Sequence, residues 1–79
     1  MNAEQNAQKY AIVTGAASGI GKEVARQLAD DGWRVAITDI NAEGLAQTAA
    51  DIGELAIDAT PLDISNHEAV ERWAGGIVD

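Results

Sequence analysis

Residues 10–21, YAIVTGAASGIG, contain the signal that decides the fold. The first five are a short apolar run followed by a glycine, as expected for a strand buried in a parallel sheet. From Gly19 to Asp31 the apolar residues instead recur every fourth position, which predicts a helix, and Gly32 lies where a C-cap glycine is expected. We therefore expect a strand that runs into a helix through a glycine-rich turn.

This turn has the chemistry of a phosphate-binding loop. A bound phosphate needs free backbone N–H groups and the positive end of a helix dipole. Gly15 is expected to make the turn, Gly19 to let the backbone approach a pyrophosphate, and Gly21 to let the helix pack near the sheet. The Ser18 hydroxyl can donate to a phosphate oxygen. The alternative is a tight turn that binds nothing, although three glycines in seven residues in this context favour a ligand.

The rest of the chain repeats the alternation of strand and helix. We expect strands over 34–39 and between Leu55 and Leu62, and helices over 42–52 and after the N-cap Ser65. Pro61 cannot donate a ladder hydrogen bond, so the third strand should lie at a sheet edge. Short connections and right-handed crossovers make the strands parallel. The prediction is an α/β fold over residues 10–79, a parallel β-α-β-α-β-α half of a doubly wound sheet with strand order 3-2-1, after a polar tail over 1–9.

The spacing of the glycines makes a family resemblance specific. It is G-x-x-x-G-x-G, not the G-x-G-x-x-G of most dinucleotide folds. Thr-Gly-x-x-x-Gly-Ile-Gly after an N-terminal strand resembles the cofactor motif of the short-chain dehydrogenase/reductase family, and the resemblance covers nearly the whole chain, from about residue 10 to 79. It implies the N-terminal, adenosine-binding half of an NAD-binding Rossmann domain. In the loop it implies cofactor contacts from Gly15, Ser18, Gly19, Ile20 and Gly21.

Asp39 is the second candidate, at the end of the second predicted strand and 24 residues after Gly15. A carboxylate there can accept hydrogen bonds from both adenosine ribose hydroxyls and repels the 2′-phosphate of NADP. The alternative is a helix N-cap or an ordinary loop acid. The resemblance implies a preference for NAD and places Ile40 against the adenine. NADP-preferring members often carry a basic residue at the position of Ser18 or Ile40, and neither is basic here.

Asp63 and Ile64 follow the third predicted strand. The resemblance implies that they contact the adenine, with the Asp63 carboxylate accepting from the exocyclic amine and the next backbone amide donating to the ring. The alternative is ordinary turn chemistry before a helix, because Asp is common near an N-cap.

No catalytic residue is expected in this chain. The family resemblance implies an active site of Tyr-x-x-x-Lys, Ser and Asn, and an Asn-Asn-Ala-Gly stretch after a fourth strand, none of which occurs in these 79 residues. We therefore expect a truncated, cofactor-binding portion of an NAD-dependent enzyme that interconverts an alcohol and a ketone by hydride transfer. The alternatives are a stand-alone dinucleotide-binding module and a half-domain that assembles with itself.

Composition limits the remaining possibilities. A net charge of −8 argues against nucleic acid and against an anionic membrane surface, and no apolar run is long enough for a membrane span. The absence of cysteine excludes thiolate metal sites and fits a reducing cytoplasm; the single histidine, His67, is expected to be solvated and not a metal ligand. The first strand would have one unpaired edge, so we expect a homo-oligomer or association with a missing C-terminal half.

Overall fold

The computed structural model describes residues 9–78 and contains three strands and three α-helices in strict alternation. Most of the predicted tail, residues 1–8, lies outside the described range. Residue Lys9 is not a detached tail residue, since its carbonyl accepts a hydrogen bond from the Arg34 N–H at 2.8 Å. In chain order the elements are β1 (Tyr10–Thr14), α2 (Gly19–Asp30), β2 (Arg34–Thr38), α3 (Ala42–Ile52), a 3-10 turn η1 (Gly53–Leu55), β3 (Ala56–Ala59) and α4 (His67–Val78).

The sheet is parallel, with β2 between β1 and β3. This is the predicted 3-2-1 order, which is the same arrangement when the strands are read from the opposite edge. β1 and β2 pair in register from Tyr10 opposite Arg34 to Thr14 opposite Thr38. Both strands end together. The glycine turn and Asp39, which follow them, therefore lie side by side at the carboxyl ends of the strands.

The third strand is shorter than predicted, and Pro61 lies beyond its end. The hydrogen-bond ladder nevertheless continues past the strand, because the N–H groups of Thr60 and Leu62 donate to the carbonyls of Ile37 and Asp39 at 3.2 and 3.1 Å. Alternate residues face β2, so the proline nitrogen between these two donors faces away from the sheet. The missing N–H therefore costs no ladder bond, as expected at an edge.

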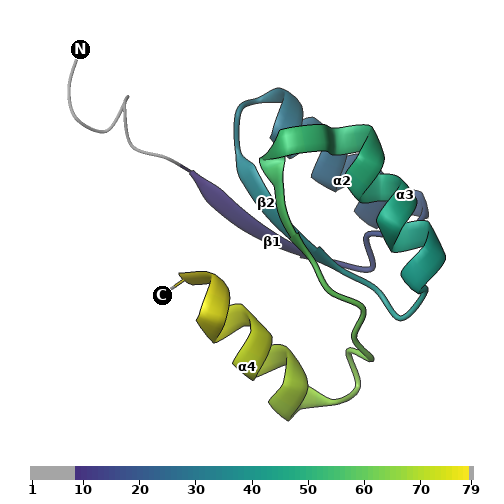
Figure 1. Ribbon diagram of the computed structural model, residues 1–79, viewed down its shortest axis with the longest axis vertical. Coiled ribbons are helices and arrows are strands. Elements are labelled where there is room, and N and C mark those ends of the chain that lie inside the picture. The colour runs from purple at the N-terminus through teal and green to yellow at the C-terminus, as the bar shows by residue number, and fades with distance from the viewer. Residues whose placement is uncertain (1–8, 79) are drawn as a thin grey trace.

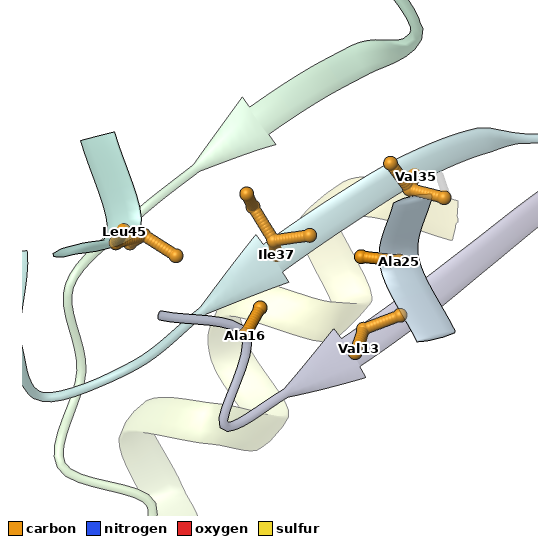
Figure 2. Close-up of a cluster of buried hydrophobic side chains, with 6 residues drawn as sticks. All are labelled: Val13, Ala16, Ala25, Val35, Ile37 and Leu45. Carbon is orange, nitrogen blue, oxygen red and sulfur yellow. The ribbon is translucent and has the colours of Figure 1, made fainter. Parts of the chain in front are cut away.

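Helices α2 and α3 lie together on one side of the sheet, and α4 lies on the other (Figure 1). The core fills the space between the first two helices and the sheet. Small residues allow the helix and the loop to come close to the strands, and branched residues fill the remaining space (Figure 2); the cluster comprises Val13, Ala16, Ala25, Val35, Ile37 and Leu45. Every residue of the cluster comes from β1, β2, α2, α3 or the glycine turn.

The helix ends follow the local sequence, with one exception. Gly32, with φ of 90°, closes α2: its N–H donates to the Ala29 carbonyl and the next N–H, that of Trp33, to the Leu28 carbonyl. At α4 the prediction of Ser65 as N-cap is wrong, because the Asn66 side chain accepts from the Ala69 N–H at 3.1 Å and fills that role. The Ser65 side chain is instead engaged by Asp63.

Helix α4 is tied to the sheet by its indole. The Nε1–H of Trp73 donates to Asp58 Oδ1 at 2.8 Å, and both side chains are half-buried. This hydrogen bond joins α4 to β3. On the same side of the sheet Ile12 keeps 39% of its surface exposed, so α4 leaves part of that face uncovered.

Candidate functional site

The three glycines of the turn meet three different requirements. Gly15 and Gly19 have φ of 67° and 62°, in the left-handed region that favours glycine. A Cβ at either position would meet no atom within 4 Å, so their need is conformational. A Cβ at Gly21 would lie 2.1 Å from the Gly15 carbonyl oxygen, so this position needs glycine for space. Gly21 was expected to let the helix pack near the sheet. In the structure it lets α2 pack against the Gly15 carbonyl of the turn.

The glycine turn leads directly into the N-terminus of α2. Ser18 is the N-cap residue in an extended conformation, and its hydroxyl makes no capping bond. The first turn of α2 carries no acidic side chain. Ser18, Gly19 and Ile20 are exposed, with Ile20 at 85%. The backbone N–H groups at this helix end present a positive potential, and no acidic side chain of the first turn neutralises it.

Asp39 reaches from the end of β2 to the glycine turn. Its Oδ2 accepts a hydrogen bond from the Ala17 N–H at 3.0 Å, and its Oδ1 accepts one from the Asn41 N–H at 2.9 Å. The bond from Asn41, followed by that from Ala17, lowers the pKa of the Asp39 carboxyl below its ordinary value. Asp39 is not the cap of α3, because Asn41 has that role through its bond from the Gly44 N–H. A carboxylate has about four acceptor positions, so these backbone bonds leave Asp39 able to accept a further hydrogen bond from a ligand.

Asp63 lies in the turn before α4. Its Oδ1 accepts from both the N–H and the hydroxyl of Ser65, at 2.9 and 2.7 Å. These two bonds, that of the hydroxyl first, lower the pKa of the Asp63 carboxyl. Ordinary turn chemistry is thus present here, as the alternative interpretation held. Neither bond involves Oδ2, which leaves that oxygen for a ligand.

A hollow of about 270 Å³ joins five of the nine predicted site residues: Gly15, Asp39, Ile40, Asp63 and Ile64. They come from three separate connections, after β1, after β2 and before α4. Two carboxylates suit hydroxyl and amine donors, while Ile40 and Ile64, 71% and 52% exposed, offer apolar faces to a flat ring. The other four, Ser18, Gly19, Ile20 and Gly21, do not line this hollow and follow Gly15 along the chain. Their binding roles stay predictions.

A second hollow, of about 480 Å³, is larger, but its lining comes from a single helix and its cap. It lies over α3 and is lined by Asn41, Glu43, Gly44, Ala46, Gln47 and Ala50, all from that helix and its cap. Ligand sites normally collect polar groups from several elements. The smaller hollow meets that condition and is the stronger candidate.

Sequence reasoning missed Thr48, which is fully buried on α3. Its hydroxyl donates to the Ala16 carbonyl at 2.8 Å, with the Gly44 carbonyl at 3.1 Å as the second acceptor in reach. The signal in the sequence was a hydroxyl residue three positions after Leu45, on the apolar face of the helix. The pattern alone does not name its partner, which is 32 residues away.

Known proteins are similar to this chain in sequence. A family model described as short chain dehydrogenase matches residues 9–79. The chain is 46% identical over 68 residues to 2-dehydro-3-deoxy-L-rhamnonate dehydrogenase (NAD(+)) of Sphingomonas sp. (strain SKA58), covering 86% of this chain and 26% of that protein. It is 41% identical over 71 residues to sorbitol dehydrogenase of Cereibacter sphaeroides, covering 90% of this chain and 27% of that protein.

A solved structure also superposes well. The 3-ketoacyl-(acyl-carrier-protein) reductase from Brucella melitensis, complexed with NADH, matches with a TM-score of 0.79 and 35% identity, over 86% of this chain and 28% of that one. The chain therefore spans about a quarter of the length of these relatives. Between residues 9 and 78, no helix combines the length and apolar character needed to cross a membrane.

Proposed function

The chain belongs to the short-chain dehydrogenase family, and on that premise we propose that it forms the part of an NAD-dependent oxidoreductase that binds the adenosine and pyrophosphate of the cofactor. The observation that carries the proposal is the convergence of the glycine turn, Asp39 and Asp63 at one hollow. The names of two relatives point to the same cofactor, since one is an NAD(+) dehydrogenase and another was solved with NADH.

The residues fit such a cofactor part by part. Gly21 has no Cβ, so the backbone of the turn is free to lie against α2, and the N–H groups at Ser18 to Ile20 would hold the pyrophosphate. Asp39 would accept from the adenosine ribose hydroxyls. Asp63 and the apolar faces of Ile40 and Ile64 would hold the adenine. A bound nicotinamide supplies hydride transfer between an alcohol and a ketone.

This chain's own part in the reaction is binding and orientation. General acid/base catalysis needs a titratable group within hydrogen-bond reach of the reacting oxygen. The only tyrosine, Tyr10, stands at the start of β1, at the opposite end of the strand from the hollow, and has no Lys four residues on. The proton transfer in the proposed alcohol–ketone interconversion therefore falls to groups outside these 79 residues, and the chain alone should form no NADH from an alcohol.

We further propose that the open side of β1 is covered by another strand, from a second copy or from a further part of the same enzyme. Among residues 9–78, β1 pairs with β2 alone, and Ile12 and Val24 remain 39% and 44% exposed. Open strand edges recruit strands. Light scattering at high micromolar concentration should find an oligomer of the isolated chain; a monodisperse monomer with strongly protected amides from Ala11 to Val13 would show that the edge needs no partner.

Calorimetric titration with NAD, ADP and nicotinamide mononucleotide tests the binding role. NAD and ADP should bind with similar affinity, because both carry the adenosine and the pyrophosphate, and nicotinamide mononucleotide should not bind. Glu43→Gln, in the hollow over α3, is the control and should leave both affinities unchanged. A chain that binds nicotinamide mononucleotide as well as ADP, or binds neither, would contradict the proposal.

A further inference from the structure

The peptide groups of Ala16 and Ala17 are held from outside the turn. The Ala16 N–H donates to the Thr38 carbonyl at 3.1 Å, and the Ala17 N–H donates to Asp39 at 3.0 Å. Ala16 and Ala17 are buried, with 0% and 8% of their surface exposed. The middle of the glycine turn is thus attached to the end of β2.

Helix α3 supplies the third attachment, through Thr48. This side chain is 0% exposed, and its hydroxyl has one hydrogen, directed to the Ala16 carbonyl at 2.8 Å. The peptide unit between Ala16 and Ala17 therefore has both its polar groups engaged. Its carbonyl accepts from Thr48 of α3, and its N–H donates to Asp39 at the end of β2. A loop of small residues gains from this, because it has few side-chain contacts to restrict it.

Close packing of α3 on the turn reinforces the bond. A Cβ at Gly44 would lie 3.0 Å from Ala17 Cβ and 3.2 Å from the Ala17 carbonyl oxygen. A side chain at position 44 would press on Ala17, so glycine lets the helix lie this close to the turn. Gly44 and Thr48 are one helical turn apart and face the same segment.

We propose that Thr48 is a positioning residue that, together with Asp39, sets the glycine turn in its phosphate-binding shape before a ligand arrives. The inference rests on the proposed function, since it concerns the same cofactor. Thr48 is fully buried and lies outside the hollow, so it acts through the turn and not by touching the ligand. A preformed loop binds more tightly because no binding free energy is lost in ordering it.

The test separates the phosphate from the nucleoside. Adenosine and ADP are titrated into the isotope-labelled full chain and followed by NMR, and the ratio of their affinities reports what the turn contributes. Thr48→Val keeps the shape and removes the hydroxyl, and should reduce the ADP-to-adenosine ratio by roughly three- to tenfold. Thr48→Ser keeps the hydroxyl and should restore the ratio.

Thr38→Val is the matched control. Thr38 is also 0% exposed, and its hydroxyl donates to the Thr60 carbonyl, away from the turn. Its backbone carbonyl, which accepts from the Ala16 N–H, is the same in threonine and valine. This variant loses a buried hydrogen bond of the same kind. It should reduce the affinities for ADP and adenosine by the same factor, so the ratio should not move.

A second measurement needs no variant and decides the matter if Thr48→Val does not fold. Hydrogen exchange in the unaltered, ligand-free chain should find the Ala16 and Ala17 amides already protected, with little further protection when ADP is added. Amides that exchange freely and become protected only with ADP would show that the ligand shapes the turn, which would overturn the inference.

The remaining outcomes are distinct. An unchanged ratio in folded Thr48→Val would overturn the positioning role while leaving ADP binding, and hence the proposed function, in place. An unaltered chain that binds ADP no better than adenosine would show that the turn holds no phosphate, and both proposals would fail together.

Discussion

The two sides of the sheet are held in very different ways. On one side α2 and α3 share a continuous core with β1 and β2, and the glycine turn is part of that core through Ala16. On the other side α4 is tied through the Trp73 indole to Asp58, and Ile12 stays partly exposed. The proposed phosphate side of the site thus belongs to the well-packed layer, while Asp63 and Ile64 belong to the segment that leads into α4. This difference predicts which substitutions act on the phosphate and which on the adenine.

Gly21→Ala should have the largest effect, because it forces a Cβ onto the Gly15 carbonyl oxygen at 2.1 Å. Backbone atoms on both sides must move, so we expect the free energy of unfolding to fall by about 3 kcal/mol and ADP binding to be lost. Urea denaturation and titration measure the two effects. Gly76→Ala in α4 is the control: a Cβ there meets nothing within 4 Å, and the alanine should raise stability by about 0.5–1 kcal/mol.

Cofactor choice should depend on Asp39. Its carboxylate would repel the 2′-phosphate of NADP, and the ribose hydrogen bonds would be lost. We expect NAD to bind at least about tenfold more tightly than NADP. Competition titrations on the unaltered chain and on Asp39→Ala measure this ratio, which should fall toward one in the variant. Equal affinities for the two cofactors in the unaltered chain would refute a role of Asp39 in selection.

Trp73→Phe tests the weaker side of the molecule. The variant keeps an aromatic ring and removes the Nε1–H donor to Asp58. We expect the free energy of unfolding of α4 to fall by about 1 kcal/mol. The effect should be confined to this helix, since a phenyl ring still covers the sheet. Hydrogen exchange should show faster exchange in α4 with α2 unchanged. Uniform acceleration in both helices would mean that the two sides unfold as one unit.

The smallest effect is expected from acid. Hydrogen bonds from backbone N–H groups lower the pKa of Asp39, and those from Ser65 lower that of Asp63. Depressed folded-state values stabilise the fold above the unfolded-state pKa of about 3.9, and this stability is lost as the pH falls through the lower, folded-state pKa. Stability measured by urea denaturation should therefore decline between about pH 5 and 2.

Asp39→Asn should decline less steeply than the unaltered chain over the same range. Asp30→Asn, which removes a charge at the exposed end of α2, provides the comparison for charge alone. An Asp39→Asn curve parallel to that of the unaltered chain would show that these hydrogen bonds contribute nothing measurable.

The element pattern could be predicted because each signal is local. The bounds of β1 and α3 are those that periodicity indicated, and Gly32 ends α2 as a C-cap glycine does. The third strand was predicted too long because the apolar stretch continues past Ala59 through Pro61. Beyond Ala59 the chain keeps only the hydrogen bonds from the Thr60 and Leu62 N–H groups, to the carbonyls of residues 37 and 39. Ser65 was predicted as the N-cap because Glu68 follows it by three residues, as in a capping box. In the structure the Ser65 hydroxyl donates to Asp63, two residues earlier, and Asn66 caps the helix instead.

The candidate site was predictable to the extent that its residues follow strand ends. Gly15 and Asp39 meet because β1 and β2 are parallel and end in register. Thr48 was not predictable, since its partner depends on how α3 lies across the turn. The bond from Ala17 to Asp39 was likewise hidden, because a carboxylate at a strand end has several backbone donors in reach.

Chemical-shift mapping with ADP on the isotope-labelled chain tests most directly that these residues form one nucleotide site. The largest shifts should fall on the amides of residues 15–21, Asp39 and Ile40, with smaller ones at Asp63 and Ile64. Residues of the hollow over α3, Ala46, Gln47 and Ala50, should not move. Shifts centred on α3 or α4 with the glycine turn unaffected, or no shifts at millimolar ADP, would contradict the assignment of this hollow.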